Sequence, residues 1–233
     1  MRYECEQVEL KRKDDGTDLY LTKFWCPASW QDKNILMVHG LTYTQHVFDI
    51  KYKDYSVCEY FAKNGYTVWR LDLSGYGKSG KYEDGWKVTT QHAAEDEIYA
   101  LEKICELQGV EKLDLLGWSW GTMTTSKVAS QRPDLLKKVV WLGPCFGGAF
   151  EATPVTELHG MWVDHTYAQD GGHGRPNGGA KEIMEIGDGW LIDTKAVKLL
   201  HLHGAGHAMY LEKDYYQTTR EAILKGLSVN TDF

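Results

Sequence analysis

Short apolar runs alternate with amphipathic stretches over the first two thirds of the chain. The runs "NILMVHG", "YTVWRLDL", "KLDLL" and "KKVVWLG" are typical of strands buried on both faces of a parallel sheet. Helical spacing in residues 55–64 and 89–108, which stop at Gly65 and Gly109, and in "TMTTSKVASQ" predicts the helices between them. Strand and helix alternate four times, so the pattern predicts a doubly wound, mostly parallel α/β sheet with helices on both faces.

The two ends of the chain depart from this alternation. "YECEQVEL" and "LYLTKFW", separated by the turn "DDGTD", predict an N-terminal hairpin. Residues 143–190 hold 11 of the 24 glycines and little periodicity, which predicts an excursion from the sheet, either a loop-rich lid or a linker. "VKLLHLHG" then predicts a final strand and "KDYYQTTREAILKGL" a closing helix. We therefore divide the chain into core residues 1–142, the lid-like excursion 143–196 and core residues 197–233.

Composition narrows the class of protein. The 233 residues are 42% hydrophobic with a net charge of −7, and no apolar run approaches the roughly 20 residues of a membrane span. The charge leaves no broad basic face for nucleic acid, so a small molecule or peptide is the expected partner. Five scattered cysteines without a C-x-x-C pair argue against a disulfide framework and a zinc site. With a charged N-terminus in place of a signal peptide, these features predict a cytoplasmic protein.

The stretch "LDLLGWSWGTM", residues 113–123, carries the clearest chemistry. It places G-x-S-x-G between a buried strand and a helix expected to begin at Thr122, the arrangement of a nucleophile elbow. Such a turn forces Ser119 into strained backbone geometry and exposes its hydroxyl, while Gly117 and Gly121 avoid collisions with neighbouring backbone. The helix N-terminus behind the serine favours negative charge near it.

A serine hydroxyl needs a base, and nine histidines compete for that role. His207 lies in "LHLHGAGHAMYLE", between the last predicted strand and helix, where a doubly wound sheet brings a C-terminal loop to the edge that carries the elbow. The other histidines are expected to have structural roles: His201 and His203 at packing positions, His159, His165 and His173 in surface loops, and His39 in a turn. His46 and His92 have no context that supports a catalytic role.

Acyl transfer also needs backbone N–H groups that face the developing oxyanion. Trp120, the residue after the nucleophile, is expected to supply one of them. Leu41, which follows the turn after "NILMVHG", is expected to supply the other.

Taken together, these motifs resemble the α/β-hydrolase superfamily over nearly the whole chain. "MVHGLT" looks like its oxyanion loop, "LDLSGYGKSG" like its D-x-x-G-x-G-x-S loop, "LLGWSWGTM" like its elbow and "GAGHAMYLE" like its histidine loop. The resemblance implies Ser119 as nucleophile, His207 as general base, and Leu41 with Trp120 as oxyanion donors. A serine at the elbow disfavours the dehalogenase and epoxide-hydrolase branches, which attack with a carboxylate.

The third triad member of that superfamily, an Asp or Glu, has no clear counterpart here. Asp188 and Asp193 leave too few residues before "KLLHLH" for a parallel crossover, which takes about a dozen or more. Three explanations follow: the acid comes from after the preceding strand, with Glu151 nearest; a Ser-His dyad works alone; or a strand-helix segment that the natural protein carries is missing near Ala196 to Lys198. We favour the third, and an intact mass agreeing with 26.6 kDa would exclude it.

The sequence therefore predicts a cofactor-free, metal-free serine hydrolase acting on carboxylic esters or related acyl compounds. A C-C bond hydrolase of β-diketone-like substrates and a non-catalytic binding protein on the same fold are the alternatives. Four tryptophans could line an apolar pocket or belong to the core: Trp118, Trp120, Trp162 and Trp190.

Overall fold

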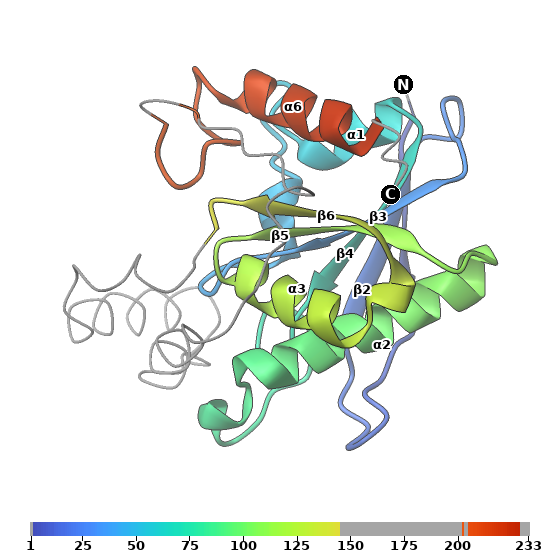
Figure 1. Cartoon of the computed structure of the whole chain (residues 1–233), viewed down its shortest axis with the longest axis vertical. Coiled ribbons are helices and arrows are strands. Elements are labelled where there is room, and N and C mark those ends of the chain that lie inside the picture. The colour runs from blue at the N-terminus through green and yellow to red at the C-terminus, as the bar shows by residue number, and fades with distance from the viewer. Residues whose placement is uncertain (1, 145–201, 203–204, 229–233) are drawn as a thin grey trace.

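The computed structural model describes residues 2–144, 202 and 205–228. A sheet of six strands forms the centre of this part of the chain, and Figure 1 shows that it is twisted. The strand order is β1-β2-β4-β3-β5-β6. The strands are β1 (Glu4–Val8), β2 (Tyr20–Trp25), β3 (Lys33–Val38), β4 (Tyr66–Asp72), β5 (Leu113–Trp118) and β6 (Leu136–Leu142).

Strand directions follow the sequence prediction. β4, β3, β5 and β6 run parallel, while β1 and β2 form the expected antiparallel hairpin, which joins the sheet through β2 and β4. Of the strand predicted from residues 197–204, only Leu202 belongs to the described residues. The stretch from Ala196 to Lys198 lies outside them. The division into a core and an excursion at 143–196 therefore stays a prediction.

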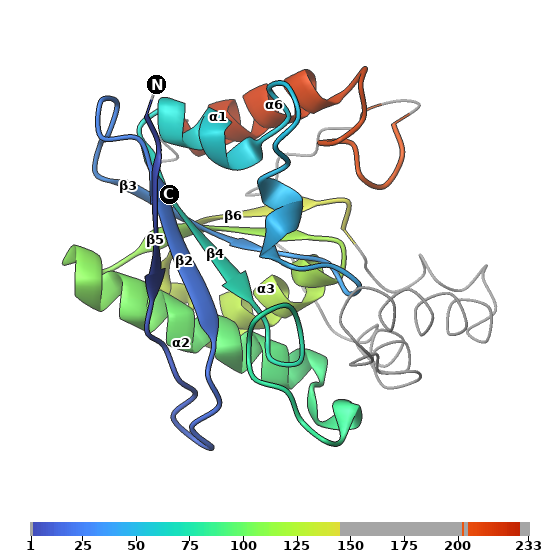
Figure 2. The ribbon, with the colours of Figure 1, turned by 180° about the vertical axis from the view of Figure 1, so that it is seen from behind.

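Helices cover both faces of the sheet, as Figures 1 and 2 show from opposite sides. α1 (Val57–Lys63) and α6 (Tyr216–Ser228) lie on one face, and α2 (Thr90–Gln108) and α3 (Trp120–Gln131) on the other. Three short 3-10 helices complete the described elements: η1 (Gln45–Phe48), η2 (Gly85–Lys87) and η3 (Pro133–Leu135). The doubly wound α/β architecture is confirmed.

The buried positions of β3 show how the sequence builds two cores. Leu36 and Val38 pack into the cluster under α2 and α3, whereas Ile35 and Met37 pack into the cluster under α1 and α6. Successive side chains of a strand point to opposite faces, so a continuous apolar run is what a sheet covered on both sides requires.

Local signals define the helix ends. The side chains of Ser56 and Thr89 accept hydrogen bonds from the N–H groups of Glu59 and His92 and cap α1 and α2. Gly109 ends α2 in the left-handed conformation, with a φ of 65°. α3 begins at Trp120, two residues before the predicted start, and α6 begins at Tyr216, three residues after the start of the predicted segment.

Four of the five cysteines belong to the described part of the chain, where Cys5, Cys26, Cys58 and Cys105 are free thiols. None of the helices in the described residues combines the length and the apolar character that a membrane crossing would need.

An arginine in the hairpin turn ties three parts of the fold together, which the hydrophobic pattern does not reveal. The Arg12 side chain is fully buried and forms ion pairs with Asp14, Glu95 and Asp96. The second carboxylate oxygen of Asp96 accepts from the backbone N–H of Ser74 at 2.8 Å, in the loop after β4. Arg12 and Asp96 therefore link the hairpin, α2 and the loop at the end of β4.

Replacing Arg12 with methionine is expected to lower the free energy of unfolding by about 3 kcal/mol or more, because the Asp96 carboxylate stays buried without its partner. Urea denaturation measures the loss. The matched control is Lys13→Met: Lys13 is exposed and pairs with Glu102 at the surface, so less than about 1 kcal/mol is expected there. Equal losses in the two variants would contradict a structural role for the buried pair.

Candidate active site

Ser119 occupies the junction of β5 and α3, and its backbone is strained there. Its φ of 57° and ψ of −124° place a non-glycine residue in the left-handed half of conformational space, as the elbow motif predicts. The Ser119 N–H donates to the carbonyl of Leu142 at 3.0 Å, and the Ser119 carbonyl accepts from the N–H and hydroxyl of Thr122. These contacts fix a half-buried hydroxyl at the carboxyl edge of the sheet.

Both glycines of the motif are required by close packing. A Cβ at Gly117 would lie 2.3 Å from the carbonyl oxygen of Gly121. A Cβ at Gly121 would lie 2.7 Å from the carbonyl oxygen of Val38, at the end of β3. The first turn of α3 can therefore approach β5 and β3 only without side chains at these two positions, which confirms the sequence interpretation.

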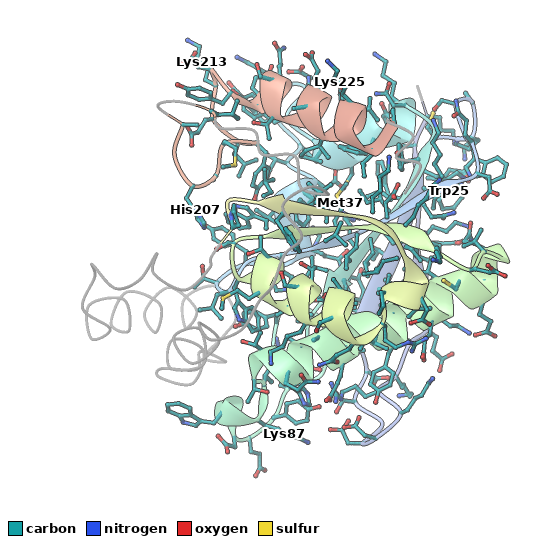
Figure 3. The ribbon with its side chains drawn as sticks, viewed as in Figure 1. Trp25, Met37, Lys87, His207, Lys213 and Lys225 are labelled. Carbon is teal, nitrogen blue, oxygen red and sulfur yellow. The ribbon has the colours of Figure 1, made fainter. Side chains whose placement is uncertain are left out.

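His207, 88 residues further along the chain, lies against the elbow. Its Nε2 is 2.7 Å from the Ser119 Oγ, and Figure 3 shows it beside the ends of β5 and β6. The residue is exposed overall, yet its ring packs against Trp118, and this partial desolvation lowers the pKa of His207 below its ordinary value. This shift favours the uncharged imidazole, the form that accepts a proton from a hydroxyl.

The turn after β3 also reaches the nucleophile. A Cβ at Gly40 would lie 3.0 Å from the Cβ of Ser119, so the oxyanion-loop motif lies directly beside the elbow, with Leu41 as its next residue. Trp120, the other predicted donor, is the first residue of α3. The structure thus places Trp120 directly after Ser119 and the turn that leads to Leu41 beside it, while their roles as N–H donors to a bound oxyanion stay a prediction.

His39 holds this turn in place, as its position in the sequence suggests. The residue is fully buried, and its Nε2 accepts from the backbone N–H of Leu73 at 3.3 Å. Its Nδ1 lies 2.7 Å from the carbonyl oxygen of Gly40 and so carries the proton of that hydrogen bond. Both ring nitrogens are used by backbone groups, which leaves the ring a structural role.

Asp72 organises the neighbouring D-x-x-G-x-G-x-S loop. Its carboxylate is fully buried and accepts from the backbone N–H groups of Gln45 at 2.7 Å and Lys78 at 2.9 Å. A Cβ at Gly77, whose φ is 46°, would lie 2.1 Å from this carboxylate. The motif therefore ties η1 and the loop after β4 together below the site.

Several sequence candidates fall elsewhere. His46 is exposed on η1, and His92 is buried on α2, where burial and the Arg12 cation lower its pKa to about 4. The remaining histidines lie outside the described residues: His159, His165, His173, His201 and His203.

The acid of a triad is not found among the described residues. Within 2–144, 202 and 205–228 no carboxylate makes a hydrogen bond or ion pair with His207, and Glu151, Asp188 and Asp193 lie outside these ranges. Glu212 shapes the histidine loop differently, since its carboxylate accepts from the backbone N–H of Gly206 at 3.1 Å.

The two tryptophans of the elbow belong to the core. Trp118 and Trp120 are 2% and 1% exposed, so they do not form the walls of an open pocket, and Trp162 and Trp190 lie outside the described residues. The indole N–H of Trp120 donates to the hydroxyl of Thr90 at 3.0 Å and joins α3 to the start of α2. The indole N–H of Trp118 donates to the carbonyl of His207 at 3.1 Å, a contact that sequence reasoning missed.

Comparison with known proteins agrees with this fold. The family model described as alpha/beta hydrolase fold matches residues 33–171, and the chain belongs to this family. An epoxide hydrolase from Vigna radiata is similar in structure, with 20% identity and a TM-score of 0.50 over 70% of this chain and 47% of that one. Epoxide hydrolase I of potato (Solanum tuberosum) is similar with 23% identity and a TM-score of 0.51, over 71% of this chain and 47% of that one. The chain thus spans about half the length of these solved structures.

Proposed function

We propose that the protein is a serine hydrolase that cleaves carboxylic esters or related acyl compounds through an acyl-enzyme. The observation that carries this proposal is the 2.7 Å contact between the Ser119 Oγ and the His207 Nε2 at a strained elbow. Fold membership alone would not carry it, because this fold supports many activities.

In the proposed reaction His207 takes the proton of Ser119 as the serine oxygen attacks the acyl carbon. Leu41 and Trp120 donate their backbone N–H groups to the oxyanion, and His207 returns the proton to the leaving alcohol. Water, deprotonated by His207, then attacks the acyl-serine, which releases the acid and restores the hydroxyl. The substrate is a small acyl compound, and Ser119, His207 and water supply every atom and proton that these steps need.

The serine also bears on the choice between ester and epoxide substrates. Attack of a serine oxygen on an epoxide carbon would form an ether, which water does not cleave under mild conditions, so the enzyme would not turn over. Attack on an ester carbonyl forms an acyl-serine, which water hydrolyses readily. The two epoxide hydrolases above share the fold with this chain. Because a serine cannot turn over an epoxide in this way, we assign this chain the acyl chemistry.

Two further expectations complete the proposal. Five widely scattered cysteines without a C-x-x-C pair are typical of a protein of a reducing compartment, and we place the reaction in the cytoplasm. The acid that would orient His207 is sought among Glu151, Asp188, Asp193 or a segment missing near Ala196 to Lys198.

Labelling with a fluorophosphonate tests the proposal. The complete protein is expected to react with one equivalent of the reagent, and peptide mapping is expected to place the adduct on Ser119. Product analysis with a panel of p-nitrophenyl esters and β-diketones then separates an esterase from a C-C bond hydrolase. A protein that takes up no label and turns over no member of the panel would instead be a binding protein on a hydrolase scaffold.

A further inference from the structure

Trp118, the residue before the nucleophile, contacts both the histidine loop and the turn that follows β3. We infer that Trp118 is a positioning residue, whose indole fixes the histidine loop and the oxyanion loop relative to Ser119. This inference rests on the proposed function and assigns a new role within the same site.

The contact with the histidine loop is a directed hydrogen bond. The indole Nε1–H of Trp118 donates to the backbone carbonyl of His207 at 3.1 Å, and the centroids of the two rings lie 5.6 Å apart. A hydrogen bond to the main chain of His207 limits how far its imidazole can move from Ser119. Such a donor is the only polar group of a tryptophan side chain, so no other rotamer of this residue replaces it at the same place.

The contact with the oxyanion loop is steric. A Cβ at Gly40 would lie 3.1 Å from the Cε3 and Cζ3 atoms of Trp118, so the loop backbone rests on the benzene edge of the indole. Tyr43, from the same loop, packs edge-on at 4.9 Å between centroids, and Tyr210, from the histidine loop, packs edge-on at 5.3 Å. The indole is therefore enclosed between the two loops and is only 2% exposed.

Trp118 can hold both loops at fixed positions relative to Ser119 because its own backbone is fixed. It is the last residue of β5, pairs with β6 and precedes the nucleophile in sequence. Rigid strand backbone holds the indole, and the indole holds the two loops. Gly143 adds to this arrangement, since a Cβ there would lie 3.2 Å from the His207 Nδ1 and push the ring away. Among the described residues, Ser119, Trp118 and Gly143 thus all lie against His207.

The test removes the indole N–H and measures the reactivity of Ser119. Trp118→Phe removes the donor and part of the ring, and incorporation of benzothienylalanine at position 118 removes the donor alone and keeps the shape. Trp69→Phe is the matched control, because Trp69 is also fully buried and donates its Nε1–H to Asn34 at 3.0 Å, within the strand pair β3 and β4. The measurements are the rate constant of fluorophosphonate labelling, kcat and KM for p-nitrophenyl acetate, and their pH profiles.

Both Trp118 variants are expected to label about 10-fold to 100-fold more slowly, the range that a displacement of about 1 Å in a reacting group produces. The loss should fall on kcat with KM nearly unchanged, because the indole acts on the base and touches no substrate. The plateau at neutral pH should give way to a rate that rises with hydroxide, since a displaced imidazole no longer takes the proton. Trp69→Phe should label at the unaltered rate.

Equal labelling rates in the unaltered protein and the benzothienylalanine variant would overturn the positioning role, and this variant also decides the matter if Trp118→Phe does not fold. A slower rate in Trp69→Phe of the same size would overturn it too, since a general loss of packing would then account for both. Failure of the unaltered protein to label at all would instead overturn the proposed function, so the two failures are distinct.

Discussion

Replacing Ser119 with alanine is expected to abolish turnover of a p-nitrophenyl ester, with a loss in kcat on the order of 10⁵-fold, and to prevent fluorophosphonate labelling. Alanine removes the oxygen that forms the acyl bond and leaves the rest of the elbow in place. The strained φ of 57° at this position is tolerated by alanine no better and no worse than by serine, so the fold should persist. Steady-state kinetics and intact mass after labelling measure the two effects.

The control for this variant lies on the same helix. Ser130 is exposed near the end of α3, and its hydroxyl bonds only the carbonyl of Lys127 among the interactions of the described residues. Ser130→Ala should keep full activity and labelling. Retention of ester hydrolysis in Ser119→Ala would contradict the assignment of the nucleophile.

The second large effect is expected from His207→Asn, with a loss in kcat on the order of 10⁴-fold to 10⁶-fold. Asparagine cannot reach the Ser119 Oγ as the imidazole Nε2 does, and it cannot take up a proton at neutral pH. Labelling of Ser119 should slow to a similar degree. His46→Asn, at an exposed histidine of η1, is the control and should behave as the unaltered protein. A His207→Asn variant that labels at the unaltered rate would show that another group activates the serine.

The pH profile gives an independent view of the same residue. Partial desolvation lowers the pKa of His207, so its uncharged form persists to more acidic pH than that of a free imidazole. As the pH falls, kcat/KM should therefore reach half of its maximum only below pH 6.5, the ordinary pKa of histidine. A limb centred above that pH would mean that a carboxylate outside the described residues stabilises the imidazolium.

Much of the fold could be predicted because its signals are local. Continuous apolar runs predicted the parallel strands β3 to β6, and periodic stretches ended by Gly65 and Gly109 predicted α1 and α2. Each signal arises from side chains that share one strand face or one helix turn, so no knowledge of distant residues is needed. The elbow at Ser119 was predictable for the same reason, since two glycines and one serine within five residues define its backbone.

Contacts between distant parts of the chain could not be predicted in this way. No hydrophobic period or motif marks Arg12 in the sequence, whereas the fold buries it against Asp96 on α2. The sequence left open whether the tryptophans beside Ser119 line a pocket or belong to the core, and it named no partners for them. In the structure the indole of Trp120 donates to Thr90, 30 residues away, and the indole of Trp118 donates to the carbonyl of His207.

By itself the sequence determined a doubly wound sheet, the strained turn at Ser119, and the order in which nucleophile and base follow along the chain. Only the tertiary structure decided that His207 lies 2.7 Å from Ser119 and that Trp118 contacts both the base and the oxyanion loop. The physical reason is that strands and turns are set by neighbours in sequence, whereas a site is set by packing between segments that meet only at the edge of the folded sheet.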